Sequence, residues 1–190
     1  DGPTYGTVGF SYDFTVSGDD PEGDNLYYWV DWGDDTTGHW DGPHPPNEDV
    51  VLSHIWEEPG EYEVKVKSKD DYYESAWSDP IIITIKSLLE IQSIKGGFFK
   101  TSAVLKNNGV DALDCVRWTI SLEGGAFIGG ETSGEIDIPS GEEVTINSGF
   151  ILGFGETRII VNVEVPECSD SMWRGGFVYL FYVHVNIGGY

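Results

Sequence analysis

The sequence is poor in basic residues. Of its 190 residues, 10 are Lys or Arg and 33 are Asp or Glu, so the formal net charge at pH 7 is −23. Nucleic acids attract clustered Lys and Arg and repel a protein of this charge, which excludes nucleic acid as a default partner. Such a surface keeps the chain soluble and makes its copies repel one another at low ionic strength.

Long apolar runs and methionine are scarce too. No stretch has the roughly 20 apolar residues of a membrane helix, so no membrane span is expected. The chain has one Met but 25 Gly, seven Trp and ten Tyr, a composition typical of an all-β protein. Its 39% of hydrophobic residues are enough to build packed cores.

Apolar and polar residues alternate with a period of two over many short segments, which Gly, Pro, Asn and Asp bound. In residues 61–69, Tyr62, Val64 and Val66 fall on one face and charged residues on the other, which predicts a half-buried strand. Many short strands separated by turns favour β-sandwiches over a single barrel. The predicted strands cover residues 6–16, 26–32, 50–55, 61–69, 81–85, 89–94, 98–106, 115–122, 135–138, 143–148, 157–165 and 175–187.

The composition changes near Lys86 and Ser87. Residues 1–86 contain 20 acidic and 4 basic residues, whereas residues 87–190 contain 13 and 6. The length suits two small domains. We therefore predict tandem domains at residues 1–86 and 87–190, with most of the negative charge on the first.

Three motifs follow one another in the first domain. They are Val30-Asp-Trp-Gly-Asp-Asp35, Ser53-His-Ile-Trp56 and Glu58-Pro-Gly-Glu-Tyr-Glu-Val64. In this order and spacing they resemble the PKD domain, an immunoglobulin-like β-sandwich, over residues 3–86. The sequence departs from the family pattern at Val30, where Trp is usual, and at Asp35, where Gly is usual. The resemblance implies a non-catalytic, extracellular domain of a microbial surface protein.

The second domain carries two strand and turn motifs, Ala103-Val-Leu-Lys-Asn-Asn-Gly109 and Gly141-Glu-Glu-Val-Thr145. They resemble immunoglobulin-like domains of archaeal and bacterial surface proteins, and this resemblance implies the fold alone. The two resemblances together imply an all-β fold class with two tandem immunoglobulin-like β-sandwich domains.

The densest acidic segment is the loop at residues 18–25. Calcium takes six to eight oxygen ligands, which clustered carboxylates supply. One interpretation is a calcium site, with Asp34 expected at the same end of the sandwich; no other cofactor is required. The other interpretation is a solvated acidic turn, in which Asp, Pro, Gly and Asn are also favoured. The candidate ligands are Asp19, Asp20, Glu22, Asp24 and Asp34.

Aromatic residues are numerous in the first domain. Trp40 lies in a loop rich in Gly, Pro and His, and Trp29 is expected to face outward from its strand. Exposed rings can form a platform for sugars, so both are candidate ligand-binding residues for a polysaccharide. The alternative is that they cover the edges of a small sandwich.

The chain has two cysteines, Cys115 and Cys168, both at the ends of predicted strands. In an acidic chain of exported type they predict one disulfide that closes a loop of about 50 residues, worth roughly 3–4 kcal/mol on the chain-entropy model. The alternative is two free, buried thiols.

The predicted strand at residues 175–187 is apolar on both faces. Phe177 begins one face, and Val178, Leu180 and Tyr182 occupy the other. A last strand of a sandwich normally alternates, so its second face must contact something other than water. Either the same chain covers this face, or a neighbouring subunit does so by packing or by strand addition. These four residues form the candidate assembly strand.

The sequence supports two functional hypotheses. The first is a non-enzymatic extracellular structural protein of a microbial cell surface, a subunit of a filament, pilus-like or surface-layer assembly with an adhesive role. Its partners are copies of itself or other surface proteins. The second is a carbohydrate- or protein-binding accessory module of a secreted protein. An enzyme is not expected, since no nucleophile elbow, phosphate-binding glycine loop or His-Glu-x-x-His zinc motif occurs.

Overall fold

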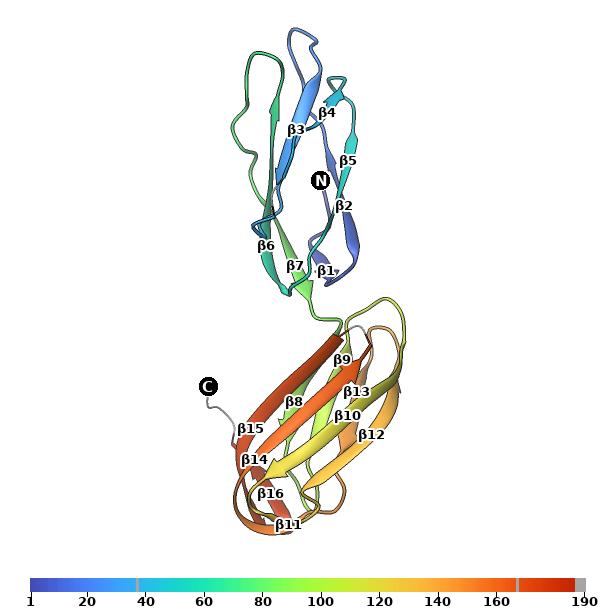
Figure 1. Ribbon diagram of the computed structural model, residues 1–190, viewed down its shortest axis with the longest axis vertical. Helices are drawn as coiled ribbons and strands as arrows, with labels where there is room; N and C mark the ends of the chain where they lie inside the picture. Colours follow the sequence, from blue (N-terminus) through green and yellow to red (C-terminus); the bar gives the residue numbers. More distant parts are fainter. Residues whose placement is uncertain (37, 167, 187–190) are drawn as a thin grey trace. The chain divides into compact units, whose positions relative to one another are not determined.

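The computed structural model describes residues 1–36, 38–166 and 168–186. The regular structure in these ranges consists of β-strands, so the all-β fold class is confirmed (Figure 1). Across the same ranges no helix has the length and apolarity to cross a membrane. The chain divides into two compact units, Asp1–Ser87 and Leu88–Tyr190, which we call unit 1 and unit 2 and describe separately.

Unit 1 is a sandwich of two sheets (Figure 1). One sheet has the strand order β1-β7-β6-β3-β4, and β2 pairs with β5 in the other. β1 runs parallel to β7, and the other neighbours are antiparallel. The strands are β1 (Tyr5–Thr7), β2 (Ser11–Val16), β3 (Leu26–Asp31), β4 (Asp41–His44), β5 (Val50–Ile55), β6 (Gly60–Lys69) and β7 (Ile81–Lys86).

The core of unit 1 surrounds Trp56, which is 1% exposed. On β6, Val64 is buried in the same cluster, and Tyr62 and Val66 pack against it, which confirms the predicted half-buried strand. The predicted strand at 6–16 is two strands, because Gly9 has a φ of 79°. A positive φ suits glycine and lets the chain pass from the sheet of β7 to that of β5.

Unit 2 is a second sandwich. Its larger sheet has the order β12-β10-β14-β15-β16, with β11 paired to β14, and its smaller sheet is β13-β9-β8. Leu105, Ile120 and Val161 are fully buried between the sheets. The strands are β8 (Leu89–Lys95), β9 (Ser102–Asn107), β10 (Leu113–Glu123), β11 (Ala126–Ile128), β12 (Glu131–Ile138), β13 (Glu143–Asn147), β14 (Leu152–Val165), β15 (Cys168–Leu180) and β16 (Tyr182–Val185).

The C-terminal apolar segment differs from its prediction. It is a hairpin of β15 and β16, and the expected single strand at 175–187 is therefore wrong; Ile187 lies outside the described residues. The chain reverses beside Leu180, which has a φ of 53°, and Tyr179 pairs with Tyr182. The reversal places Val178 opposite Val183 with both fully buried. Folding back thus covers, within unit 2, part of the surface that a single strand would leave open.

Two strands were not predicted. β4 contains Gly42 and Pro43, which are typical of turns, and β11 is three residues long between glycine pairs. Each is held by pairing with a neighbour, β3 for β4 and β14 for β11. Local patterns do not indicate strands of this kind, because the neighbour rather than the segment supplies the stabilising hydrogen bonds.

Candidate functional sites

The acidic loop does not include Asp34. Asp24 precedes β3 and Asp34 follows it, so the six-residue strand, about 20 Å long, separates them. The predicted five-residue ligand set is therefore wrong in its placement of Asp34. Within the loop, the Asp20 carboxylate accepts hydrogen bonds from the backbone N–H groups of Glu22 (3.1 Å) and Asp24 (2.8 Å).

Asp19 also has a partner, since its Oδ1 accepts from Asn47 Nδ2 at 2.9 Å. Among the described residues, no group of three or more His, Cys, Asp or Glu side chains is arranged to hold a metal ion. The hydrogen bonds within the loop are those of an acidic turn. Calcium binding by Asp19, Asp20, Glu22 and Asp24 stays a prediction.

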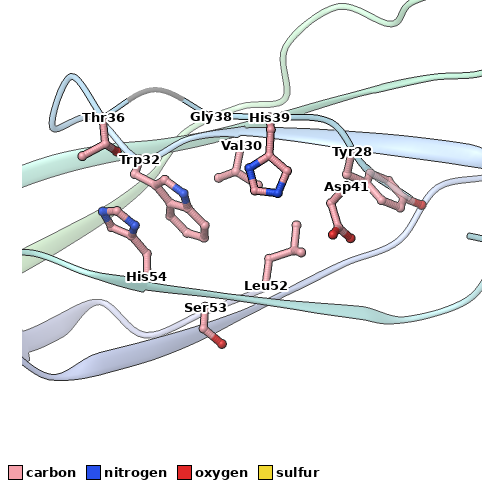
Figure 2. Close-up of a pocket in the computed structure, with 10 residues that line it drawn as sticks. All are labelled: Tyr28, Val30, Trp32, Thr36, Gly38, His39, Asp41, Leu52, Ser53 and His54. Carbon is pink, nitrogen blue, oxygen red and sulfur yellow. The ribbon is translucent and has the colours of Figure 1, made fainter. Parts of the chain in front are cut away.

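A cavity of about 330 Å³ opens between β3 and β5 of unit 1 (Figure 2). Trp32 and His39 border it from the side of β3 and the following loop, and Leu52 and His54 from β5, whereas Ser53 points away. Its volume is at the lower end of ligand pockets.

His54 joins the two sides of this cavity. Its Nε2 lies 2.7 Å from Oδ2 of Asp34, and its ring stacks on Trp32 with centroids 4.7 Å apart and planes within 5°. Thr36 Oγ1 donates to the other Asp34 oxygen at 2.6 Å. In β4, His44 Nε2 similarly lies 2.6 Å from Asp41 Oδ2. The His54 contact therefore ties β5 to the loop after β3, whereas His44 and Asp41 lie on the same strand, β4.

These contacts set the pKa of Asp34. Its partial burial alone would raise the pKa, but the hydrogen bonds from Thr36 and His54 outweigh burial and hold the pKa below its usual value. A carboxyl whose pKa is lower in the folded state stabilises the fold above its unfolded pKa, near 3.9, and loses that contribution as the pH falls through its folded value.

Substitution of Asp34 tests this pairing. We expect Asp34→Asn to lower the melting temperature at pH 7 and to flatten the loss of stability below about pH 4, because the titrating group is gone. Asp35→Asn is the control, because Asp35 is the exposed neighbour of Asp34. Its backbone is in the left-handed region with a φ of 59°, which Asn also tolerates. Equal acid profiles for all three proteins, followed by circular dichroism, would contradict the assignment.

The structure brings the two candidate ligand-binding tryptophans together. Trp29 on β3 and Trp40 before β4 form an edge-to-face pair with ring centroids 5.5 Å apart. Lys67 Nζ lies 5.4 Å from the Trp40 ring and 4.9 Å from the Trp77 ring, and Lys69 Nζ lies 4.6 Å from Trp40. The chain's own lysines therefore cover much of the ring surface on which a sugar would stack.

The lysines of this face were not predicted as part of a site. β3 and β6 pair so that Trp29 lies opposite Lys67 and Tyr27 opposite Lys69. The alternation within each segment was visible in the sequence, but the register between them was not.

The predicted disulfide is not present. Cys115 lies on β10 and Cys168 begins β15, and β14 runs between these strands. Two strand spacings are about 10 Å, beyond the roughly 7 Å that Cα atoms of a disulfide span. The two cysteines are accordingly not bonded to each other, and Cys115 is exposed.

The candidate assembly residues divide between core and surface. Val178 is fully buried and Phe177 is half-buried, with its ring 4.4 Å from that of Tyr179, whereas Leu180 and Tyr182 are exposed. The exposed pair lies at the turn between β15 and β16, at the end of unit 2 that carries β11 (Figure 1). Further exposed apolar residues on segments that meet at this end enlarge the apolar surface. We call it the aromatic end; its ten exposed residues are Phe98, Phe99, Phe127, Ile128, Phe150, Phe154, Tyr179, Leu180, Phe181 and Tyr182.

The two-sheet architecture of unit 1 is that of an immunoglobulin-like β-sandwich module. Residues 1–78 match the family model of the PKD domain, and through them the chain belongs to the PKD domain family. Domains of this family are typically extracellular and non-catalytic, which suggests an extracellular surface-protein module for unit 1.

Solved structures add two comparisons. The PKD domain of an M14-like peptidase from Thermoplasmatales archaeon SCGC AB-540-F20 is 41% identical; the match covers 45% of this chain and 89% of that one, with a TM-score of 0.43. Salmonella alpha-2-macroglobulin is 11% identical over 92% of this chain and 16% of its own length, with a TM-score of 0.40. A comparison with curated proteins found no match.

Proposed function

We propose that this chain is a non-enzymatic structural part of a microbial cell-surface protein, displayed outside the cell. In this proposal the PKD domain at residues 1–86 is followed by a second immunoglobulin-like domain at 87–190, and the chain joins its neighbours in a filament, pilus-like or surface-layer assembly with an adhesive role. The aromatic end of unit 2 supports the proposal. On a chain with a net charge of −23, it is a large apolar surface of the kind that marks an interaction site.

Surface display is tested by labelling lysines on intact cells of the source organism with a reagent that cannot cross membranes. The chain has seven lysines spread over both units. We expect labelling of intact cells to equal labelling after lysis, while a cytoplasmic control protein is labelled only after lysis. A chain that is labelled only after lysis is not a surface protein.

Assembly is tested by electron microscopy of native surface material with an antibody against the chain. Regularly spaced labels along a filament or over a lattice are expected. Labels found only on dispersed single molecules would contradict the assembly.

The alternative of a polysaccharide-binding module has one observation in its favour, the contact of Trp29 with Trp40. We expect a glycan array to show no saturable binding at this face, because Lys67 and Lys69 cover the rings. Saturable binding that Trp40→Ala abolishes, and that the unit 2 control Trp173→Ala preserves, would instead assign the chain to the binding modules.

A further inference from the structure

We propose that the aromatic end of unit 2 binds the same end of a second copy of this chain and forms a two-fold, end-to-end pair. The inference rests on the proposed function, because it names the partner of the surface that supports it.

Four segments far apart in the sequence build this end. The Phe99 N–H donates to Phe181 O at 2.5 Å, and the Ile151 N–H donates to Phe99 O at 2.7 Å. Gly153 pairs with both Ala126 and Leu180. Residues 124–130, 148–155 and 176–183 contain no charged residue, and Lys100 is the single charge in 96–101. The end is therefore a surface without carboxylates in its four segments, on a protein that is otherwise acidic.

Glycines make this end a fixed surface. A Cβ atom on Gly153 would lie 1.9 Å from Gly125 O, and one on Gly96 would lie 2.0 Å from Val183 O. Backbone thus packs directly on backbone beneath the end, which leaves no room there for side chains of the size of Phe or Tyr. The rings stay on the outside, where they contact one another: Phe99 and Phe150 have centroids 5.2 Å apart, and Phe98 and Tyr182 are 5.0 Å apart.

Two bulky residues at this end occupy the left-handed backbone region. Phe99 has a φ of 62° and Leu180 a φ of 53°. Large apolar side chains are outliers there, and Gly, Asn or Asp would hold the same turn at lower cost. Neither side chain is needed in the core, because both are exposed. Backbone strain of this kind clusters at functional sites, and here it keeps apolar side chains on the surface.

The size of the surface fits a protein interface. The ten residues are between 38% and 75% exposed, which at about 150–250 Å² for each large side chain amounts to on the order of 1,000 Å². The largest apolar patch of a typical monomer is about 300–600 Å², whereas one side of a stable interface buries about 800 Å².

Charge decides which surface of a second copy fits. The loop ends of unit 1 carry carboxylates, including Asp20, Asp24, Asp70 and Asp71, which would lose water against rings whose four segments offer them Lys100 as a counter-charge. An identical aromatic end brings no carboxylate from its loops. A surface that binds itself gives a closed two-fold pair, in contrast to the open chain produced by a head-to-tail contact. Growth of the proposed assembly beyond the pair then takes a second contact elsewhere on the chain.

The test is sedimentation velocity of the full chain from about 1 µM to about 1 mM. We expect a concentration-dependent species of twice the 21.0 kDa chain mass. Leu180→Asp should raise the dissociation constant about 100-fold or more, because the pair would bury two unpaired carboxylates. It should leave the melting temperature equal or higher, because Asp tolerates a φ of 53° better than Leu.

Val110→Asp is the matched control. Val110 is 77% exposed and lies in the loop after β9, at the opposite end of that strand from Phe99, so its variant should dimerise like the unmodified chain. Phe127→Asp is a second variant that should also weaken the pair. A chain that stays monomeric throughout, or a Leu180→Asp variant with an unchanged dissociation constant, would overturn the inference.

Two further outcomes would also overturn it. Open-ended growth that Leu180→Asp abolishes would indicate a head-to-tail contact and would leave the proposed function standing. Binding of a monomeric chain to phosphatidylcholine vesicles, lost in Leu180→Asp, would assign the aromatic end to a lipid surface. Failure of the surface-labelling experiment, by contrast, would remove the proposed function whatever the state of the pair.

Discussion

Replacing Trp56 by alanine is expected to lower the free energy of unfolding of unit 1 by about 3–5 kcal/mol. The indole is the centre of the aromatic core: its ring lies 6.1 Å from Phe14, 6.0 Å from Trp32 and 5.7 Å from Tyr62. Its Nε1 also donates to Trp32 O at 3.3 Å. Alanine would leave a cavity that Phe14, Trp32 and Tyr62 cannot fill without losing their own contacts.

Hydrogen exchange of the full chain, followed by mass spectrometry, measures this loss for peptides of unit 1. Trp77→Ala is the matched control, since Trp77 is 43% exposed and its ring contacts the Lys67 ammonium group. We expect the control to cost less than about 1 kcal/mol, the range of an exposed cation–π contact. A Trp56→Ala chain that exchanges like the control would show that the core is misassigned.

In unit 2 the largest effect is expected from Asn107→Leu, about 3 kcal/mol of unfolding free energy. Asn107 is fully buried, and its amide binds backbone groups of two segments, the loop after β9 and the end of β12. Nδ2 donates to Asp111 O at 2.8 Å and to Ile138 O at 3.0 Å, and Oδ1 accepts from the Gly109 N–H at 2.8 Å. Leucine has a similar volume but cannot bond these groups, and each buried group left without a partner costs about 1–3 kcal/mol.

The measurement is urea unfolding followed by hydrogen exchange in peptides of unit 2. Asn147→Leu provides the control, because Asn147 is exposed at the end of β13. Its expected change is within about 0.5 kcal/mol. If both leucine variants lose the same free energy of unfolding, the side-chain hydrogen bonds of Asn107 do not hold the loops after β9 and β12.

The strand pattern was predictable where a segment alternates between core and solvent. Val64 lies where the alternation of β6 places it, and Tyr28 and Val30 are buried on β3 while Trp29 faces out. β4 and β11 were not predictable, because their strand geometry comes from a neighbour. The hairpin at Leu180 was missed because a bulky apolar residue is rarely found at a positive φ, so no turn signal marked it.

The candidate sites were predictable one residue at a time and not as groups. Trp29 and Trp40 were singled out and do meet, but the lysines that cover them came from the pairing of β3 with β6. Asp34 was grouped with the wrong carboxylates, because the sequence does not tell which end of a strand a loop occupies. The sequence indicated only the C-terminal part of the aromatic end. It did not show that Phe99 contacts both Phe150 and the C-terminal residue Phe181.

By itself the sequence determined the all-β class, the acidic surface and the PKD family of residues 1–78, because each is readable within one segment or from composition alone. The tertiary structure alone decided that Cys115 and Cys168 lie two strands apart, that His54 bonds Asp34, and that four segments without carboxylates meet at the aromatic end. The reason is physical: these contacts join residues tens of positions apart and depend on sheet order and strand register. Local alternation is compatible with several orders and registers, and only packing of the whole unit selects one.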